Sequence, residues 1–199
     1  MKIIVVGGTG TIGRAVVDQL KPRHEVVVVG MSSGEFQVDI RDVASIEKMY
    51  QAIGSFDALV STVGKVKFAP LAEMTADSYA IGLQDKLMGQ VNLVLIGLKH
   101  INPKGSFTLT SGILSDDPIV YGSSAAMVNA ALNGFVKSSA IEMPVGVRIN
   151  VISPTVLEES LDAYGDYFLG FEAVKASRVA LAYSKSVEGA QTGQVYNVW

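Results

Sequence analysis

Three glycines near the start of the chain, Gly7, Gly10 and Gly13, are spaced so that they can hold a diphosphate group. An apolar run, 3–6, precedes them and an amphipathic segment, 12–20, follows. This pattern predicts a buried strand, a tight turn at Gly7 and a helix that packs closely at Gly13. The free N–H groups and the positive dipole end of that helix would face the diphosphate, which Gly10 lets approach the backbone. We therefore predict a dinucleotide-binding loop whose contacts come from Gly7, Thr9, Gly10, Thr11, Ile12 and Gly13.

The remainder of the chain must supply the elements that position this loop. Continuous Val and Ile runs indicate strands that are buried on both faces, hence a parallel sheet with helices on each side. The further strands are expected at 26–29, 36–38, 58–60, 106–109, 147–152 and 195–198, and the further helices at 43–53, 75–101, 123–143 and 171–184. We predict an α/β fold, a single doubly wound Rossmann-type domain over residues 1–199 with a mostly parallel seven-stranded sheet and helices on both faces.

The composition excludes several classes of function. The net charge of −3 gives no basic surface for nucleic acid. The chain has no cysteine, and its two histidines, His24 and His100, stand alone without a ligand partner at useful spacing, so we expect no metal site. No apolar run reaches the length of a membrane span, and the apolar start is too short for a signal peptide. We therefore expect a soluble, cytoplasmic protein that binds no membrane.

The segment after the second strand indicates which dinucleotide is bound. An acidic residue there would accept a hydrogen bond from the 2′-hydroxyl of NAD and would repel the 2′-phosphate of NADP. Residues 30–34 read Gly-Met-Ser-Ser-Gly, and the first carboxylate is that of Glu35. Ser32, Ser33 and their backbone N–H groups can bind a phosphate, which favours NADP over NAD. The alternative is that these serines form an ordinary polar turn.

Short motifs follow three of the later strands, at Val38-Asp39-Ile40, Ser61-Thr62-Val63-Gly64 and Ser153-Pro154-Thr155. Together with the glycine loop and the approach to the last strand at 189–195, they resemble in order the motifs of the short-chain dehydrogenase/reductase family. The resemblance covers essentially the whole chain, although Thr11 and Thr155 stand where the family has Gly. It implies that the cofactor is also bound by Asp39, Ile40, Thr62, Val63, Gly64, Pro154 and Thr155.

The catalytic positions depart from the pattern of that family. Its chemistry normally uses Asn, Ser, Tyr and Lys. The Tyr transfers a proton to or from the carbonyl oxygen, and the Lys four residues later lowers the pKa of the Tyr and binds the nicotinamide ribose. Aligning residues 130–132 with the Ala-Ala-Leu of the family puts Ala125 at the Tyr position and Asn129 at the Lys position. No Tyr in this chain is followed by Lys at four residues.

The same alignment puts Lys86 at the position of the family's Asn, and Gly112 at that of its Ser, with Ser111 just before it. Lys and Asn are thus exchanged between two helices that the family places side by side at the ribose, so an amine and an amide can remain in one site. Tyr121 can serve as a substitute acid. The resemblance therefore implies candidate catalytic residues Lys86, Ser111, Tyr121 and Asn129. The alternatives are that Lys86 is a solvated helix charge and that Tyr121 is a loop aromatic residue.

Two functions stay open at this point. The first is an NADP-dependent oxidoreductase that acts on a small carbonyl or alcohol with non-standard acid–base groups, so that its partner is a small-molecule substrate. The second is a catalytically inactive NADP(H)-binding sensor or regulatory subunit. The missing Tyr and Lys favour the second function, whereas the exchange of Lys86 and Asn129 favours the first.

Two expectations concern the surface of the molecule. The resemblance places a substrate lid after Pro154, where four aromatic residues can line an apolar pocket: Tyr164, Tyr167, Phe168 and Phe171. Small residues in the helix from Ser123 to Phe135 allow close helix packing, and the family commonly pairs this helix across a two-fold axis. We therefore expect a homo-oligomer, a dimer or a tetramer.

Overall fold

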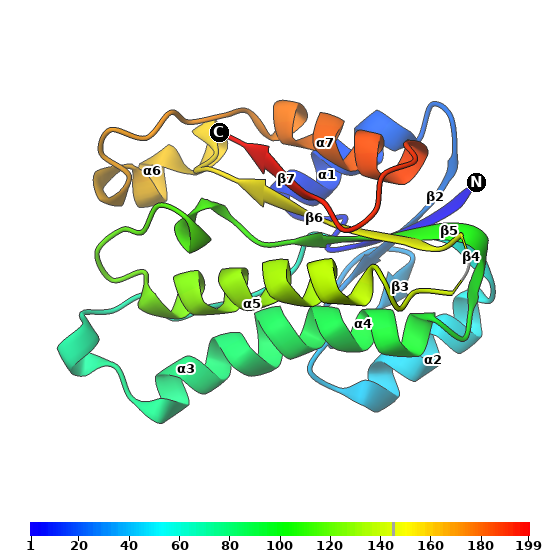
Figure 1. Ribbon diagram of the computed structural model, residues 1–199, viewed down its shortest axis with the longest axis horizontal. Helices are drawn as coiled ribbons and strands as arrows, with labels where there is room; N and C mark the ends of the chain where they lie inside the picture. Colours follow the sequence, from blue (N-terminus) through cyan, green and yellow to red (C-terminus); the bar gives the residue numbers. More distant parts are fainter. Residues whose placement is uncertain (145) are drawn as a thin grey trace.

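The strands form one sheet in which every neighbouring pair is parallel (Figure 1). The computed structural model describes residues 1–144 and 146–199. The seven strands lie in the order β3-β2-β1-β4-β5-β6-β7. Their bounds are β1 Lys2–Val6, β2 Glu25–Gly30, β3 Phe36–Gln37, β4 Phe56–Ser61, β5 Ile101–Thr110, β6 Arg148–Pro154 and β7 Val195–Val198.

Helices cover both faces of this sheet (Figure 1). On one face α1 packs beside α7 over a core that contains Ile3 and Tyr183, and on the other α2, α4 and α5 cover a core that contains Ile4 and Phe107. The helices are α1 Thr11–Leu20, α2 Val43–Ile53, α3 Ala76–Gly82, α4 Gln90–Gly97, α5 Ser123–Ser139, α6 Leu161–Tyr164 and α7 Ala176–Glu188, with a π-helical segment η2 Leu83–Gly89 between α3 and α4. The predicted doubly wound fold is confirmed.

Four of the predicted helix boundaries are wrong by four or five residues. The helix expected to run to Ile101 ends at Gly97, where a Cβ would lie 2.6 Å from the Tyr50 hydroxyl, and Ile101 already pairs with Phe56 of β4. The helix expected to run to residue 143 ends at Ser139. The last helix begins at Ala176 rather than 171, because Lys175 before it is extended and Val174 forms a β-bridge with Leu157. It also runs on to Glu188 rather than ending at 184.

The sheet order places a topological switch point between β1 and β4. The chain leaves β1 toward β2 and β3 on one side and later returns to β4 on the other, so the loops at the carboxyl ends of these strands diverge and leave a crevice. The carboxyl ends of β1, β2 and β4 carry the glycine loop, residues 30–34 and residues 62–65.

In the described residues no helix is long and apolar enough to cross a membrane.

Candidate cofactor and active site

The glycine loop turns tightly against the neighbouring strand. Gly7 has a positive φ of 85°, and its N–H donates to the Val29 carbonyl at 2.8 Å. A Cβ on Gly13 would lie 2.0 Å from the Gly7 oxygen, so a side chain there would force α1 away from the loop. Gly10 precedes α1 without a side-chain cap, and the first turn of the helix holds no acidic residue. The first N–H groups of α1 are therefore available to an anion.

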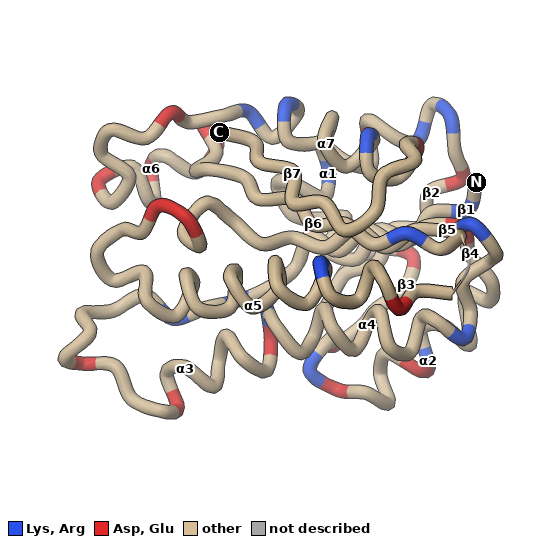
Figure 2. The backbone as a smooth tube through the Cα atoms, viewed as in Figure 1, with Lys and Arg blue, Asp and Glu red and all other residues tan. Residues whose placement is uncertain are grey.

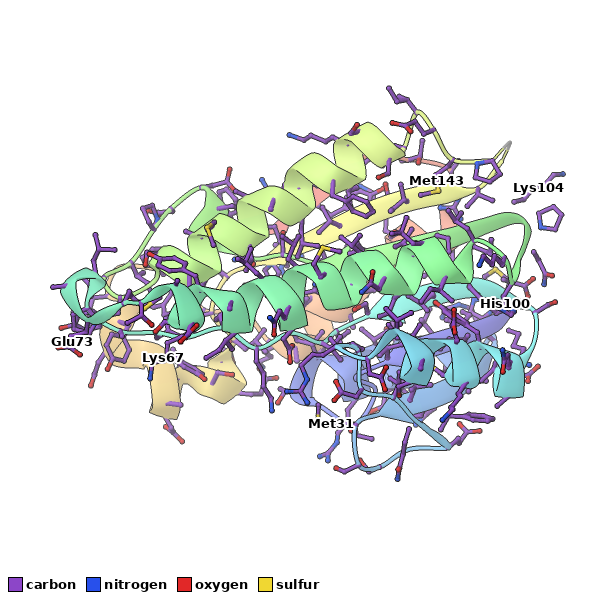
Figure 3. The ribbon with its side chains drawn as sticks, turned by 90° about the horizontal axis from the view of Figure 1, so that it is seen from below. Met31, Lys67, Glu73, His100, Lys104 and Met143 are labelled. Atoms are coloured by element: carbon purple, nitrogen blue, oxygen red, sulfur yellow. The ribbon has the colours of Figure 1, made fainter. Side chains whose placement is uncertain are left out.

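A cleft of about 370 Å³ opens beside this loop. Its walls come from the carboxyl ends of β1, β2 and β4, from the segment after β3 and from η2. The cleft is lined by Val6, Gly7, Thr9, Gly10, Gly30, Met31, Val38, Ile40, Thr62, Val63, Gly64, Lys65 and Asp85. Among the predicted cofactor contacts, the cleft brings together Gly7, Thr9, Gly10, Ile40, Thr62, Val63 and Gly64. Met31, which Figure 3 labels, Lys65 and Asp85 also line the cleft, although no motif in the sequence indicates them.

Other predicted cofactor contacts lie outside the lining of this cleft. Thr11, Ile12 and Gly13 form the first turn of α1. Ser32 and Ser33 lie in the exposed turn next to Met31.

Asp39 follows Val38, and its carboxylate is held by Arg41 in a bidentate pair with distances of 2.9 and 2.6 Å. These hydrogen bonds from Arg41 lower the pKa of Asp39 to about 2. Because Arg41 occupies both carboxylate oxygens of Asp39, that side chain is less free to meet a ligand than the resemblance implies.

The one carboxylate close to the end of β2 turns away from the cleft. Glu35 accepts a hydrogen bond from the Val28 N–H at 3.0 Å, and its own N–H donates to the Val28 carbonyl at 2.8 Å. The side chain therefore lies along β2 and does not line the cleft with Met31. A 2′-phosphate at the end of β2 would consequently meet no carboxylate from this segment.

The residues present fit a dinucleotide. A Cβ on Gly10 would come no closer than 3.4 Å to the protein, so the bare side of this glycine faces the cleft that it lines. The uncapped start of α1 suits a diphosphate, and the apolar side chains of Val38, Ile40 and Val63 suit the faces of a planar base. Among the described residues no group of three or more His, Asp or Glu side chains could hold a metal ion.

Lys86 lies between this cleft and the end of β5. A Cβ on Gly64, which lines the cleft, would lie 2.4 Å from the Cγ of Lys86. The Nζ of Lys86 donates to the Ser111 carbonyl at 2.9 Å. Burial lowers the pKa of Lys86 to about 8, since desolvation disfavours the charged form. Lys86 is therefore not a solvated helix charge, and its ammonium group loses its proton more readily than an exposed lysine does.

Gln90, which the sequence analysis missed, fixes Lys86 against β5. Its Nε2 donates to the Thr110 carbonyl and its Oε1 accepts from the Thr110 N–H, both at 2.9 Å. Its Nε2 also lies 3.0 Å from the Lys86 carbonyl. A buried amide that satisfies both backbone groups of one residue sets the register between helix and strand.

Asn129 approaches the same segment from α5. Its side chain is 2% exposed, and its Nδ2 donates to the Gly112 carbonyl at 3.3 Å. A Cβ on Gly112 would lie 3.0 Å from that Nδ2. Lys86 and Asn129 thus bind the carbonyls of two consecutive residues, Ser111 and Gly112. Within the described part of the chain the Oδ1 of Asn129 is buried without a hydrogen-bond partner.

Two further predicted residues lie beside this segment. The Ser111 N–H donates to the Ile152 carbonyl at 2.9 Å, and the buried Ser111 hydroxyl lies 3.4 Å from the same oxygen. Pro154 ends β6, and its carbonyl is 3.7 Å from the Cβ that Gly112 would carry. Thr155 is 5% exposed, and its Oγ1 has no hydrogen-bond partner among the described residues.

Tyr121 differs from the other catalytic candidates in its surroundings. It is 43% exposed, has a left-handed φ of 65° and precedes α5. Its ring lies 5.9 Å from that of Tyr167 in the lid, and the rings of Phe68 and Tyr164 lie 6.3 Å apart. These aromatic residues line a second pocket of about 250 Å³ with Ile119 and Ala163.

Ala125, which the sequence alignment puts at the position of the family's Tyr, lies in an apolar contact. Ala125 is 3% exposed and packs in a cluster with Ile113 and Leu114. Partly buried aromatic residues of the lid, Phe168 and Phe171, pack against this cluster. The site therefore has a charged and amide-rich centre at the end of β5, with an aromatic pocket beyond it.

Comparison with known proteins places this geometry in a family. A family model described as "Enoyl-(Acyl carrier protein) reductase" matches residues 11–198. The protein lin1944 from Listeria innocua has a solved structure with 52% identity, a TM-score of 0.99 and full coverage of both chains. A small-chain dehydrogenase solved in complex with NADPH has 27% identity and a TM-score of 0.88, with 100% of this chain and 96% of that chain covered.

A curated relative is similar over part of its length. The hydroxynaphthalene reductase arp2 of Aspergillus fumigatus is 27% identical over 150 residues, which are 71% of this chain and 55% of that reductase. The chain therefore spans little more than half of the length of that relative. The match to the family model begins at the first residue of α1 and covers every strand after β1, and the chain belongs to the short-chain dehydrogenase/reductase family.

Proposed function

We propose that this protein is an NADPH-dependent oxidoreductase that reduces the carbonyl group of an apolar small molecule, or oxidises the matching alcohol. The observation that carries the proposal is the cleft at the switch point, where Gly10 is bare and α1 begins without a cap. When bound, the nicotinamide cofactor supplies or accepts a hydride. The similar dehydrogenase that was solved in complex with NADPH supports a cofactor of this class.

We infer a preference for NADPH over NADH from the end of β2. Glu35 hydrogen-bonds to Val28 and does not line the cleft, so it neither binds a 2′-hydroxyl nor repels a 2′-phosphate there. Ser32 and Ser33 are exposed next to Met31 and can donate hydrogen bonds to the phosphate. The predicted role of Asp39 is weaker, because Arg41 holds its carboxylate.

We assign the polar chemistry to the residues around the end of β5. The Lys86 ammonium is a donor for the ribose hydroxyls, and its charge stabilises an oxyanion that develops nearby. The pKa of about 8 allows Lys86 to hold a proton at neutral pH and to exchange it. Asn129 and Ser111 position the Ser111–Gly112 backbone, and Tyr121 supplies a hydroxyl from the aromatic pocket.

The aromatic pocket supports an apolar, ring-bearing substrate. Its lining residues come from the segment after β4, from the loop before α5 and from the lid, and include Phe68, Tyr121 and Tyr167. Aromatic walls favour flat apolar ligands through offset or edge-to-face packing. The similar reductase from Aspergillus fumigatus is named for a hydroxynaphthalene, which is a ligand of this kind.

One observation favours a second function, that of an NADPH sensor without turnover. Ala125 fills the position of the catalytic Tyr with a buried methyl group, and Gly112 fills that of the Ser. A screen of aromatic and aliphatic carbonyl compounds, with NADPH oxidation followed by absorbance, separates the two functions. Turnover of a substrate supports the enzyme, whereas NADPH binding without turnover of any compound supports the sensor.

The cofactor assignment itself is tested with Gly10→Val. The backbone of Gly10 is extended, with φ −80° and ψ 177°, so valine is accepted there, but its side chain would enter the cleft. We expect native unfolding behaviour and loss of NADPH binding in a fluorescence titration. Gly134→Ala is the control, because a Cβ at Gly134 meets nothing within 4 Å. Equal NADPH affinity of Gly10→Val and the native chain would refute the site.

We also infer that the protein is a homo-oligomer assembled through the face that carries α4 and α5. Figure 2 shows few charged positions on these two helices. No residue of α4 is charged, and Lys137 is the charged residue of α5. Leu95 and Met127 are 52% and 40% exposed on them. Exposed apolar side chains on a nearly uncharged helix pair are typical of a contact between subunits.

A further inference from the structure

We propose that the carboxylate of Asp85 accepts a hydrogen bond from the 6-amino group of adenine and thereby makes the cleft specific for adenine as the cofactor base. This inference rests on the proposed function, since it assumes that the cleft holds an adenine dinucleotide. It assigns to Asp85 a role in base recognition that the motifs in the sequence do not indicate.

Asp85 is nearly buried and yet reaches the cleft. It is 5% exposed, belongs to the π-helical segment η2 and lines the cleft with Gly64 and Lys65. Its Oδ1 accepts a hydrogen bond from the Lys65 N–H at 2.8 Å. That bond fixes the direction of the carboxylate. Within the described residues no hydrogen bond to the other oxygen, Oδ2, is found, so this oxygen can accept a hydrogen bond from a donor in the cleft that Asp85 lines.

The geometry of the fold places the base of a dinucleotide near this carboxylate. The diphosphate belongs at the glycine loop and the ribose at the end of β2, next to Gly30 and Met31. The base then extends toward the segment after β3, between Ile40 on one side and Val63 on the other. Asp85 is the acidic residue in the described lining of this cleft, so its carboxylate meets the polar edge of the base.

Asp39, the residue that the family resemblance assigns to adenine, is otherwise engaged. Its Oδ1 accepts hydrogen bonds from the Nε and the backbone N–H of Arg41, and its Oδ2 accepts from the same guanidinium. Asp39 also does not line the cleft, whereas its neighbours Val38 and Ile40 do. The structure therefore offers the Asp85 carboxylate to the base instead.

The chemistry of the bases makes this inference testable. Adenine presents a 6-amino donor, whereas hypoxanthine presents a 6-oxo acceptor at the same position. A carboxylate accepts a hydrogen bond from the amino group and repels the oxo group. Replacing Asp85 with Asn keeps an oxygen for the Lys65 N–H and turns an amide donor toward the cleft. The variant therefore presents a hydrogen-bond donor to the base where the native residue presents an acceptor.

The experiment compares the binding of NADPH and of its hypoxanthine analogue, reduced nicotinamide hypoxanthine dinucleotide phosphate, by fluorescence titration. We expect the native chain to bind NADPH more tightly by on the order of 10- to 100-fold, as hydrogen bonds to charged groups imply. In Asp85→Asn this ratio falls to about one or inverts. In the control Asp77→Asn, which removes an exposed carboxylate of α3 that does not line the cleft, the ratio keeps its native value.

Two results overturn the inference in different ways. Equal affinity of the native chain for both cofactors, with NADPH bound normally, refutes the role of Asp85 and leaves the proposed function intact. This comparison needs no variant, so it holds even if Asp85→Asn does not fold. Absence of NADPH binding to the native chain refutes the inference together with the proposed function.

Discussion

At the scale of single residues, Lys86 combines a charge with a desolvated position. Its Nζ binds the Ser111 carbonyl, and no acidic partner of the Nζ is found among the described residues. Burial without an opposite charge disfavours the ammonium form. Such an arrangement opposes stability and is typical of groups that are retained for chemistry.

The pH dependence of stability tests this arrangement. The pKa of Lys86 is about 8 in the folded protein against an ordinary value of 10.5. Between these values the unfolded chain holds the proton and the folded chain has released it, so the free energy of unfolding rises with pH across this window. We expect this rise in the native protein and its loss in Lys86→Met, as measured by urea unfolding at neutral pH and at about pH 10. If the free energy of unfolding changed with pH in the same way in both proteins, the lowered pKa of Lys86 would be contradicted.

Lys86→Ala tests the function of the same residue. We expect NADPH binding to weaken by about 1–3 kcal/mol through the loss of a charged hydrogen bond, and any turnover found in the carbonyl screen to disappear. Lys137→Ala removes an exposed lysine of α5 and serves as the control, with an effect below about 1 kcal/mol. Native affinity and activity in Lys86→Ala would show that this lysine only fastens the backbone after β5.

Local spacing predicts some of these residues and not others. The three glycines of the loop stand out in the sequence because each meets a local requirement of a turn or a helix start. Asp85 and Gln90 are ordinary helix residues in the sequence. Their importance comes from Lys65 and Thr110, each 20 residues away, which only the folded chain brings beside them. The pairing of Arg41 with Asp39 is likewise not evident from the sequence, because exposed residues of opposite charge are often near neighbours in a chain.

At the scale of elements, a cluster at the amino-terminal end of the sheet fastens α1 to α7. Glu188 ends α7 and accepts hydrogen bonds from Arg23 at 2.7 Å and from Ser184, and it pairs with His24 at 2.9 Å. Hydrogen bonding from Arg23 is the main cause that lowers the pKa of Glu188 to about 2. The cluster therefore stabilises the carboxylate form of Glu188 in the folded state.

We predict that Glu188→Gln lowers the stability at neutral pH by about 1 kcal/mol, because a partly exposed network is screened by solvent. The contribution of the Glu188 carboxylate to the free energy of unfolding is fully present above the ordinary pKa of 4.5 and is lost as the pH falls toward 2. The stability of the variant should therefore depend less on pH in this acidic range. Thermal unfolding at several pH values measures both effects. Asp18→Asn breaks only the exposed pair with Lys21 and should leave both unchanged.

Element types follow from the sequence more directly than element ends. The Val and Ile runs of β1 and β2 identify buried strands, because both faces of each strand are covered by helices. The end of α4 and the π-helical segment instead lie where distant parts of the chain meet: Gly97 approaches Tyr50, Asp85 accepts from the Lys65 N–H, and Gln90 accepts from the Thr110 N–H. These are tertiary contacts, which cannot be predicted from the hydrophobic periodicity of a short stretch of sequence.

At the scale of the whole molecule, the outer face of α5 carries Met127, Ala130 and Gly134, all exposed and at helical spacing. We predict that the native protein sediments as a dimer or a tetramer of 21.1 kDa chains. Ala130→Arg should dissociate it, because a long charged side chain cannot be buried between two such helices without a partner.

The matched control for this prediction is Ala130→Ser, which keeps the side chain small and should keep the oligomer. A native protein that sediments only as the 21.1 kDa species at micromolar concentration would contradict the assembly. Of the small residues in this helix, Ala125 is buried in the interior and Ala130 is exposed on the outer face. The composition of the helix alone did not separate these two directions.

The strand order β3-β2-β1-β4-β5-β6-β7 has a consequence for biosynthesis. After the first three strands have left the ribosome, β4 is added to the free edge of β1, and each later strand is added to the edge that its predecessor has just formed. No strand has to be inserted between two that are already paired. Translation can therefore lay down the β4 to β7 side of this sheet in the direction of synthesis, until Val195–Val198 pairs with β6.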